Sequence, residues 1–165
     1  MLIKMEDRRP RYRLKLLGAF RLAAPDGSRL PFSSKKGIAL LGLLATAGNG
    51  ERWRPWIQEK LWGTRGPAQA QGSLRRELHG LRQVGTDVGV PLIETNRRVA
   101  RLILENVDVD VRRASRRTTR RQEFLEGLCV VGEEGFEEWL QNVRKTLRDP
   151  SGSEHPDSGP DNLGQ

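Results

Sequence analysis

The residues best suited to chemistry lie on one side of the segment 67–83. At about 100° per residue, Ala70, Leu74, Leu78 and Leu81 share a narrow apolar face, which predicts an amphipathic helix. Arginine can form two hydrogen bonds to guanine and glutamine can form two to adenine, so such a helix suits the major groove of DNA. The polar residues that the helix places opposite its apolar face, or at its flanks, are Arg75, Arg76, His79, Gln83, Ser73 and Arg82.

An ordinary solvated helix face is the alternative for these arginines, and residue pattern alone leaves it open. Gly72 falls on the same outward side, where it would let the backbone approach a phosphate closely. Gly72 and Gly80 each cost about 1 kcal/mol of helix propensity relative to alanine. The start of the helix is therefore less well defined by the sequence than its apolar face.

Two further basic groups could contact a phosphate backbone. A hairpin is expected over 92–105, with Arg97 and Arg98 at its tip, where they suit a minor groove; a basic turn without a role is the alternative. Lys35 and Lys36 begin a helix predicted over 35–47, behind Ser33 and Ser34 as N-cap residues. Backbone N–H groups and the helix dipole at such a start favour phosphate.

The charge of the chain supports an anionic partner. Its 165 residues carry 29 Lys+Arg and 21 Asp+Glu, a net charge of +8. The charge is uneven, because residues 1–121 hold 26 cationic and 11 acidic residues, whereas 122–165 hold 3 and 10. A basic excess of this size indicates nucleic acid or a membrane surface as partner, and the acidic C-terminal part indicates a second kind of partner.

The composition argues against an enzyme. One cysteine rules out a disulfide framework and a multi-cysteine zinc site, and two histidines leave little for acid–base or metal chemistry. We expect no catalytic site, no metal site and no cofactor; Asp108 and Asp110, alternating on one strand face, are too weak a signal for a nuclease. Cys129, beside Val130 and Val131, is expected to be buried.

No secretory signal and no apolar segment of the roughly 18 residues needed to cross a bilayer is found in the sequence. The expected location is therefore the cytoplasm.

The expected fold class is α+β, a winged helix-turn-helix with an N-terminal antiparallel sheet, three helices, a C-terminal hairpin wing and a short helical extension. The domains are a flexible lead-in over 1–10, a DNA-binding domain over 11–111, a partial helical segment over 112–149 and a disordered tail over 150–165. The elements predicted from periodicity and turn residues are strands 12–17, 19–24 and 29–32, helices 35–47, 53–62 and 67–83, a Gly-rich loop 84–91, hairpin strands 92–95 and 99–105, a segment 106–111 that extends or follows the hairpin, and a helix 136–147.

Two segments of the C-terminal part have open roles. Six arginines within 112–121 form a nonspecific DNA arm, a solvated helix face or a disordered linker. The helix 136–147 has Phe136, Trp139, Leu140 and Val143 on one side, and we expect it to pack on the N-terminal sheet rather than dock another protein or a second copy.

Short motifs in a fixed order resemble the DNA-binding domain of the antibiotic regulatory protein (SARP) family of bacterial transcription regulators, which is similar to the output domains of response regulators. A second match resembles part of the activation domain of that family, which continues through many more helices. The chain is accordingly a naturally short regulator or a piece of a longer one. The matching residues are Leu16-Leu17-Gly18 with Phe20, Ser34-Lys35-Lys36 with Ala39-Leu40-Leu41, Leu61-Trp62-Gly63, Ser73-Leu74-Arg75 with Leu78 and Leu81-Arg82, and downstream Phe124-Leu125-Glu126-Gly127-Leu128 and Phe136-Glu137-Glu138-Trp139-Leu140.

The resemblance implies sequence-specific binding to double-stranded DNA, and activation of transcription through contact with RNA polymerase. It makes 67–83 the recognition helix. A protein–protein interaction adaptor that reuses the fold is the alternative function, supported by the acidic C-terminal part. An apolar or acidic outward face on 67–83 would favour the adaptor, whereas its arginines favour DNA. The oligomeric state stays open.

Overall fold

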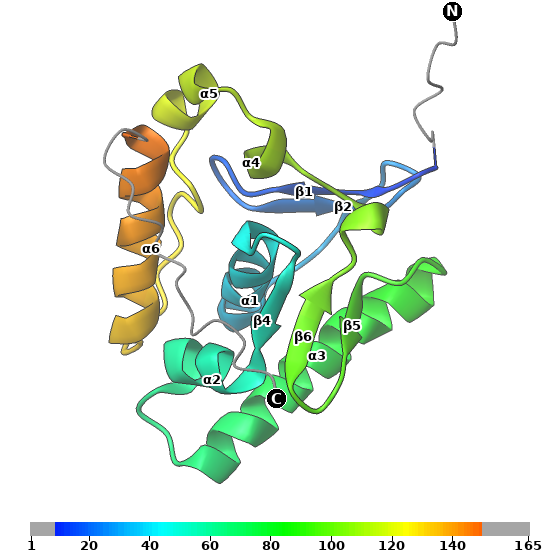
Figure 1. Ribbon diagram of the computed structural model, residues 1–165. Coiled ribbons are helices and arrows are strands. Elements are labelled where there is room, and N and C mark those ends of the chain that lie inside the picture. Colours follow the sequence, from blue (N-terminus) through cyan, green and yellow to red (C-terminus); the bar gives the residue numbers. More distant parts are fainter. Residues whose placement is uncertain (1–8, 150–165) are drawn as a thin grey trace, which may run out of the picture.

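A four-stranded sheet joins the N-terminal strands to a strand from far along the chain (Figure 1). In the computed structural model, which describes residues 9–149, its strand order is β3-β2-β1-β7. β2 pairs antiparallel with β1 and β3, and β7 pairs parallel with β1. Tyr12, Leu14 and Leu22 are buried while Arg13 and Arg21 are exposed, which is the alternation of a sheet covered on one face. The strands are β1 (Tyr12–Lys15), β2 (Arg21–Ala23), β3 (Arg29–Leu30) and β7 (Val107–Val109).

Residues 1–8 and 150–165 lie outside the described residues. The flexible lead-in expected over 1–10, for all but its last two residues, and the disordered tail expected over 150–165 therefore stay predictions.

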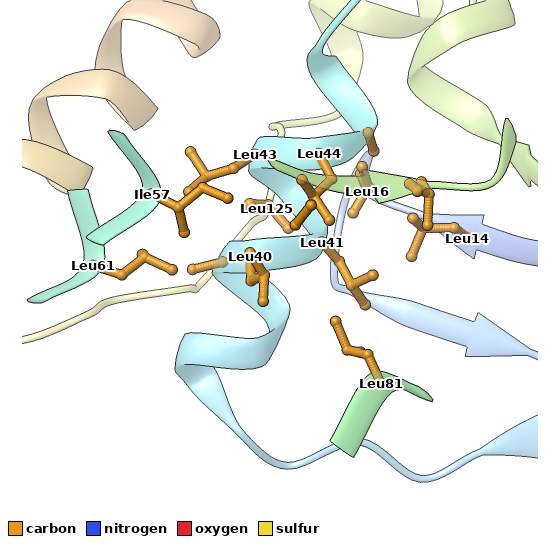
Figure 2. Packing of buried hydrophobic residues seen from close by; sticks show 14 of the residues in the cluster. Leu14, Leu16, Leu40, Leu41, Leu43, Leu44, Ile57, Leu61, Leu81 and Leu125 are labelled. Atoms are coloured by element: carbon orange, nitrogen blue, oxygen red, sulfur yellow. The ribbon is translucent and has the colours of Figure 1, made fainter. Parts of the chain in front are cut away.

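Helix α1 (Lys35–Thr46) is the centre of the core. The Ser34 side chain caps its start by accepting a hydrogen bond of 3.1 Å from the Gly37 backbone N–H. Leu40, Leu41, Leu43 and Leu44 are fully buried, because the sheet, α2 (Arg54–Trp62) and α3 (Pro67–Val88) surround this helix. Figure 2 shows the leucines of α1 between two groups of apolar side chains. Leu14 of β1 and Leu16, directly after β1, lie on one side, and Ile57 and Leu61 of α2 lie on the other.

A second sheet has the order β4-β6-β5, from β4 (Glu51–Trp53), β5 (Ile93–Thr95) and β6 (Val99–Leu102). β5 and β6 form the expected hairpin, and its turn is closed by the Asn96 side chain, which accepts hydrogen bonds from the backbone N–H groups of Arg98 and Val99. β4 was not predicted. It is only three residues long, and its pairing partner, β6, comes almost fifty residues later in the chain.

For the segments that flank the hairpin, one expectation was wrong, and the structure decides between two alternatives left open for the other: 106–111 follows the hairpin. α3 continues to Val88 instead of giving way to a loop at residue 84, and Gly89 ends it in the left-handed conformation with φ of 83°. The segment 106–111 does not extend the hairpin. After the short η1 (Leu104–Asn106) it forms β7 and the first residues of α4 (Asp110–Arg113).

The C-terminal part consists of α5 (Arg116–Arg121) and α6 (Glu134–Arg148). α6 packs against α2 and α5, so the expectation that it lies on the N-terminal sheet is wrong (Figure 1). In α6 the ring centroids of Phe136 and Trp139 lie 5.6 Å apart. The Trp139 ring packs edge-on against Phe124, with 6.0 Å between the ring centroids. Phe124, in the loop before α6, also forms an antiparallel β-bridge with Leu17 next to the N-terminal sheet, so this loop contacts that sheet.

Candidate nucleic-acid interface

The outward side of α3 carries the polar residues that the sequence places there. Arg75, Arg76, His79, Arg82 and Gln83 are all exposed, while the apolar face of the helix, Leu74, Leu78 and Leu81, is buried against the core. Gly72 and Gly80 have open space where a Cβ would stand. The helix therefore presents a basic, uncovered surface.

Ser73 lies behind this surface, at 5% exposed. Its hydroxyl accepts hydrogen bonds from Arg65 Nη1 at 3.0 Å and Arg76 Nη2 at 3.3 Å. The structure thus gives Ser73 the role of orienting Arg76, instead of the outward position at the flank of the helix that the helical pattern gave it.

The hairpin lies beside α3 and adds its own cations. Arg97 and Arg98 are exposed at the tip, and Arg82 Nη1 donates to Thr95 Oγ1 of β5 at 3.3 Å. A hollow of about 280 Å³ separates α3 from the hairpin tip and from the start of α2. The described residues that line it include no Asp or Glu and are Arg54, Pro55, Gln58, Gln71, Arg75 and Arg97.

Arg54 is the basic residue of this region that the sequence interpretation missed. Its Nη1 donates to the Asn96 carbonyl at 3.0 Å and its backbone N–H donates to the Arg98 carbonyl at 2.8 Å, which ties α2 to the hairpin turn. Burial lowers the pKa of the Arg54 guanidinium, and the charges of Arg82 and Arg75 lower it further. Three guanidinium groups therefore repel one another here, and a bound anion would relieve that repulsion. The sequence feature that could have identified Arg54 is its position just before Pro55, at the start of a helix.

We name the residues of this region the α3–hairpin surface: Arg54, Arg75, Arg76, His79, Arg82, Gln83, Arg97 and Arg98.

The two lysines expected at a phosphate site have different surroundings. Lys35 is exposed at the start of α1. Lys36 is turned to the protein, where its Nζ donates to Glu133 Oε1 at 2.6 Å and to the Leu61 carbonyl, and lies 5.1 Å from the Trp62 ring. Lys36 therefore holds the segment before α6 against α1 and α2.

Residues considered for other chemistry have structural contacts. The Asp110 carboxylate accepts hydrogen bonds from the backbone N–H groups of Leu16 at 2.9 Å and Leu17 at 3.0 Å, and Asp108 pairs with Arg113 at 2.8 Å. Cys129 is exposed, so the expectation of a buried thiol is wrong; the chain turns its neighbour Val130 inward instead. Within residues 9–149, no cluster of His, Cys, Asp and Glu has the arrangement of a metal site, and no helix has the length and apolar character needed to span a membrane.

The arginine-rich stretch 112–121 forms α4 and α5 rather than a linker. Arg112 donates to carbonyl groups at the end of α1, whereas Arg116, Arg117, Arg120 and Arg121 are exposed on α5. α5 and α3 lie at opposite ends of the molecule (Figure 1). These four arginines therefore do not belong to the α3–hairpin surface.

Comparison with known proteins shows the fold. No protein-family model and no curated protein sequence matches the chain. Among solved structures, the chain is similar to Mycobacterium tuberculosis EmbR, determined in complex with a low-affinity phosphopeptide, with a TM-score of 0.61 and 18% sequence identity. The match covers 83% of this chain and 42% of EmbR, so the chain spans less than half the length of that protein. The chain thus has the mixed α/β fold found in part of EmbR.

Proposed function

We propose that the chain is a SARP-type transcription regulator that binds double-stranded DNA through a winged helix-turn-helix over residues 11–111. Residues 112–149 form a partial activation-domain segment that contacts RNA polymerase. α3 is the recognition helix in the major groove, and the β5–β6 hairpin is the wing. The family motifs in the sequence and the fold shared with EmbR, a SARP-family regulator, support this assignment.

The observation that carries the proposal is the α3–hairpin surface. Arg75 of α3, Arg97 of the hairpin turn and Arg54 at the start of α2 line one hollow, and burial and neighbouring arginines lower the pKa of Arg54. Arginine side chains on and beside a helix that fits the major groove can bind phosphates and recognise guanine. The phosphate contacts then set affinity, and the base contacts set specificity. An adaptor for a protein partner would present apolar or acidic groups on α3, and the exposed residues at its centre are basic or neutral.

The test begins with selection of bound sequences from a random duplex library, followed by mobility shifts on a selected site. Replacing Arg75 and Arg76 with alanine should weaken specific binding by about 1–3 kcal/mol for each base that the helix no longer reads. The matched control replaces Arg116 and Arg117 of α5, which removes the same charge at the far end of the molecule.

A large loss in the α3 variant with a small loss in the α5 variant is the expected result. Unchanged affinity of the α3 variant would overturn the recognition-helix assignment. Equal losses in both variants would show that only net charge matters, which would also contradict sequence-specific reading by α3.

A further inference from the structure

A pocket of about 380 Å³ opens where the end of α1 meets α4 and α6. Its walls are mostly apolar and come from Val111 of α4 and from Trp139, Val143 and Leu147 of α6. The volume lies within the range of about 300–1,000 Å³ that small-molecule sites occupy. None of its lining residues belongs to α3 or to the hairpin, so the pocket is separate from the α3–hairpin surface.

Two arginines supply the charge of this pocket. Arg112 Nη1 donates to the Ala45 carbonyl at 3.1 Å and the Ala47 carbonyl at 2.7 Å, and its Nη2 donates to the Gly48 carbonyl at 2.7 Å. Among the described residues, nothing accepts from its Nε–H or from its second Nη2–H. The paired Nε–H and Nη2–H edge of a guanidinium matches the two oxygens of a carboxylate.

The end of α1 would by itself repel an anion, because free carbonyl groups concentrate negative charge there. Arg52 Nε donates to the Leu43 carbonyl at 2.9 Å, so guanidinium groups cover the carbonyls at this helix end from two sides. The described lining residues include no Asp or Glu. The polar rim therefore carries positive charge beside an apolar wall.

We propose that this pocket binds a small carboxylic acid with an apolar tail. The carboxylate accepts from the Nε–H of Arg112 and from the Nη2–H that Gly48 leaves over, and the tail lies along Trp139, Val143 and Leu147. Because the pocket joins the body of the protein to α6, such a ligand contacts both parts at once.

The test is calorimetric titration of the full chain with decanoate and decylamine below their micelle concentrations and with decanol below its solubility limit. Decanoate should bind at least about tenfold more tightly than decanol, since the alcohol cannot form the charge-assisted pair of hydrogen bonds. Decylamine should bind more weakly still, because its charge has the sign of the two arginines. Equal affinity for decanoate and decanol, or no binding of decanoate, would overturn the proposal.

Two variants locate the site. Arg112→Gln should abolish the preference for decanoate, whereas Arg29→Gln, which removes the same charge from exposed β3, should retain it. Since Arg112 also caps α1, a second variant, Val143→Trp, fills the pocket from α6 and should prevent decanoate binding while leaving Arg112 in place. Decanoate binding that survives in both pocket variants contradicts the assignment. Failure of these titrations leaves the proposed DNA binding untouched, because no residue is shared.

Discussion

The Glu77 carboxylate of α3 accepts a hydrogen bond of 2.8 Å from the hydroxyl of Ser34, the residue that caps α1. One hydroxyl thus closes the start of the central helix and joins that start to the middle of α3, behind its exposed side. The packing here is tight, because a Cβ on Gly37 would stand 2.7 Å from the Phe32 ring and 3.0 Å from Glu77 Oε2. The position of the candidate recognition helix therefore depends on how α1 begins.

Ser34→Ala should lower the free energy of unfolding by about 1 kcal/mol, because the Gly37 N–H loses its cap and Glu77 loses its donor. Urea denaturation measures the change. Ser33→Ala, at the exposed neighbouring position, should change stability by less than about 0.5 kcal/mol. Similar effects at both positions would contradict the capping role of Ser34.

Gly72→Ala and Gly80→Ala should each stabilise the protein by about 0.5–1 kcal/mol, since both glycines lie within α3 and a Cβ meets nothing within 4 Å. If the Gly72 backbone approaches a phosphate, Gly72→Ala should nevertheless weaken DNA binding more than Gly80→Ala does. Thermal unfolding and mobility shifts, measured on the same preparations, separate the two effects. Equal DNA affinity of the two variants would remove Gly72 from the interface.

Arg97→Ala and Arg98→Ala should weaken binding to all duplex sequences alike, as expected for arginines of the hairpin that bind phosphates. The slope of log affinity against log salt should become less steep by about one for each phosphate that the variant no longer binds. Binding measured at several salt concentrations gives the slope. A sequence-dependent loss of affinity with an unchanged slope would instead mean that the hairpin reads bases.

Asp110→Ala should destabilise the protein by about 2–3 kcal/mol, because the N–H groups of Leu16 and Leu17, both buried residues, lose their acceptor. Asp108→Ala removes only a partly exposed ion pair with Arg113 and should cost less than about 1 kcal/mol. Chemical denaturation of the two variants gives the comparison. Equal costs would mean that the backbone hydrogen bonds of Asp110 contribute little.

Tyr12 provides a spectroscopic measure of folding at alkaline pH, because it is the single tyrosine of the chain. Burial raises the pKa of its phenol above the ordinary value of 10.0, and the hydroxyl donates to the Val90 carbonyl at 2.7 Å. The folded state holds the phenol proton more tightly than the unfolded state does. The resulting contribution of Tyr12 to the free energy of unfolding is complete below pH 10 and is lost as pH rises through the folded pKa. Phenolate absorbance should titrate later in the folded protein than in urea. Coincident titrations would mean that the phenol is solvated.

The sequence predicts the elements of this fold better than their ends and partners. The apolar spacing of Leu74, Leu78 and Leu81 identifies α3 because a helical period is a local property. Gly85 looks like a loop residue, yet it is buried within the helix, and a Cβ there would lie 3.1 Å from the Leu92 backbone nitrogen. It is therefore glycine because the returning chain packs against it, and no local pattern reveals that packing.

In the candidate site too, the local sequence pattern predicts some features and tertiary contacts determine the others. Exposure of Arg75 and Arg76 follows from the helical pattern, whereas the partner of Lys36 does not, because Glu133 lies 97 positions away in the chain. Arg54 joins the site through the Asn96 carbonyl of the hairpin, which only the tertiary structure brings near. Periodicity identifies which residues of one element face solvent, and contacts between elements decide which of them act together.

The parallel pairing of β1 with β7 has a consequence for how the protein is made. β1 gains its second neighbour, the edge strand β7, only when Val107–Val109 have been synthesised, after α1, α2, α3 and the hairpin. During translation β1 therefore has one hydrogen-bonding edge unpaired until the residues up to Val109 have left the ribosome, and such non-local pairing is slow. Completion of the sheet, rather than formation of the helices, should time the moment at which a nascent chain becomes resistant to protease.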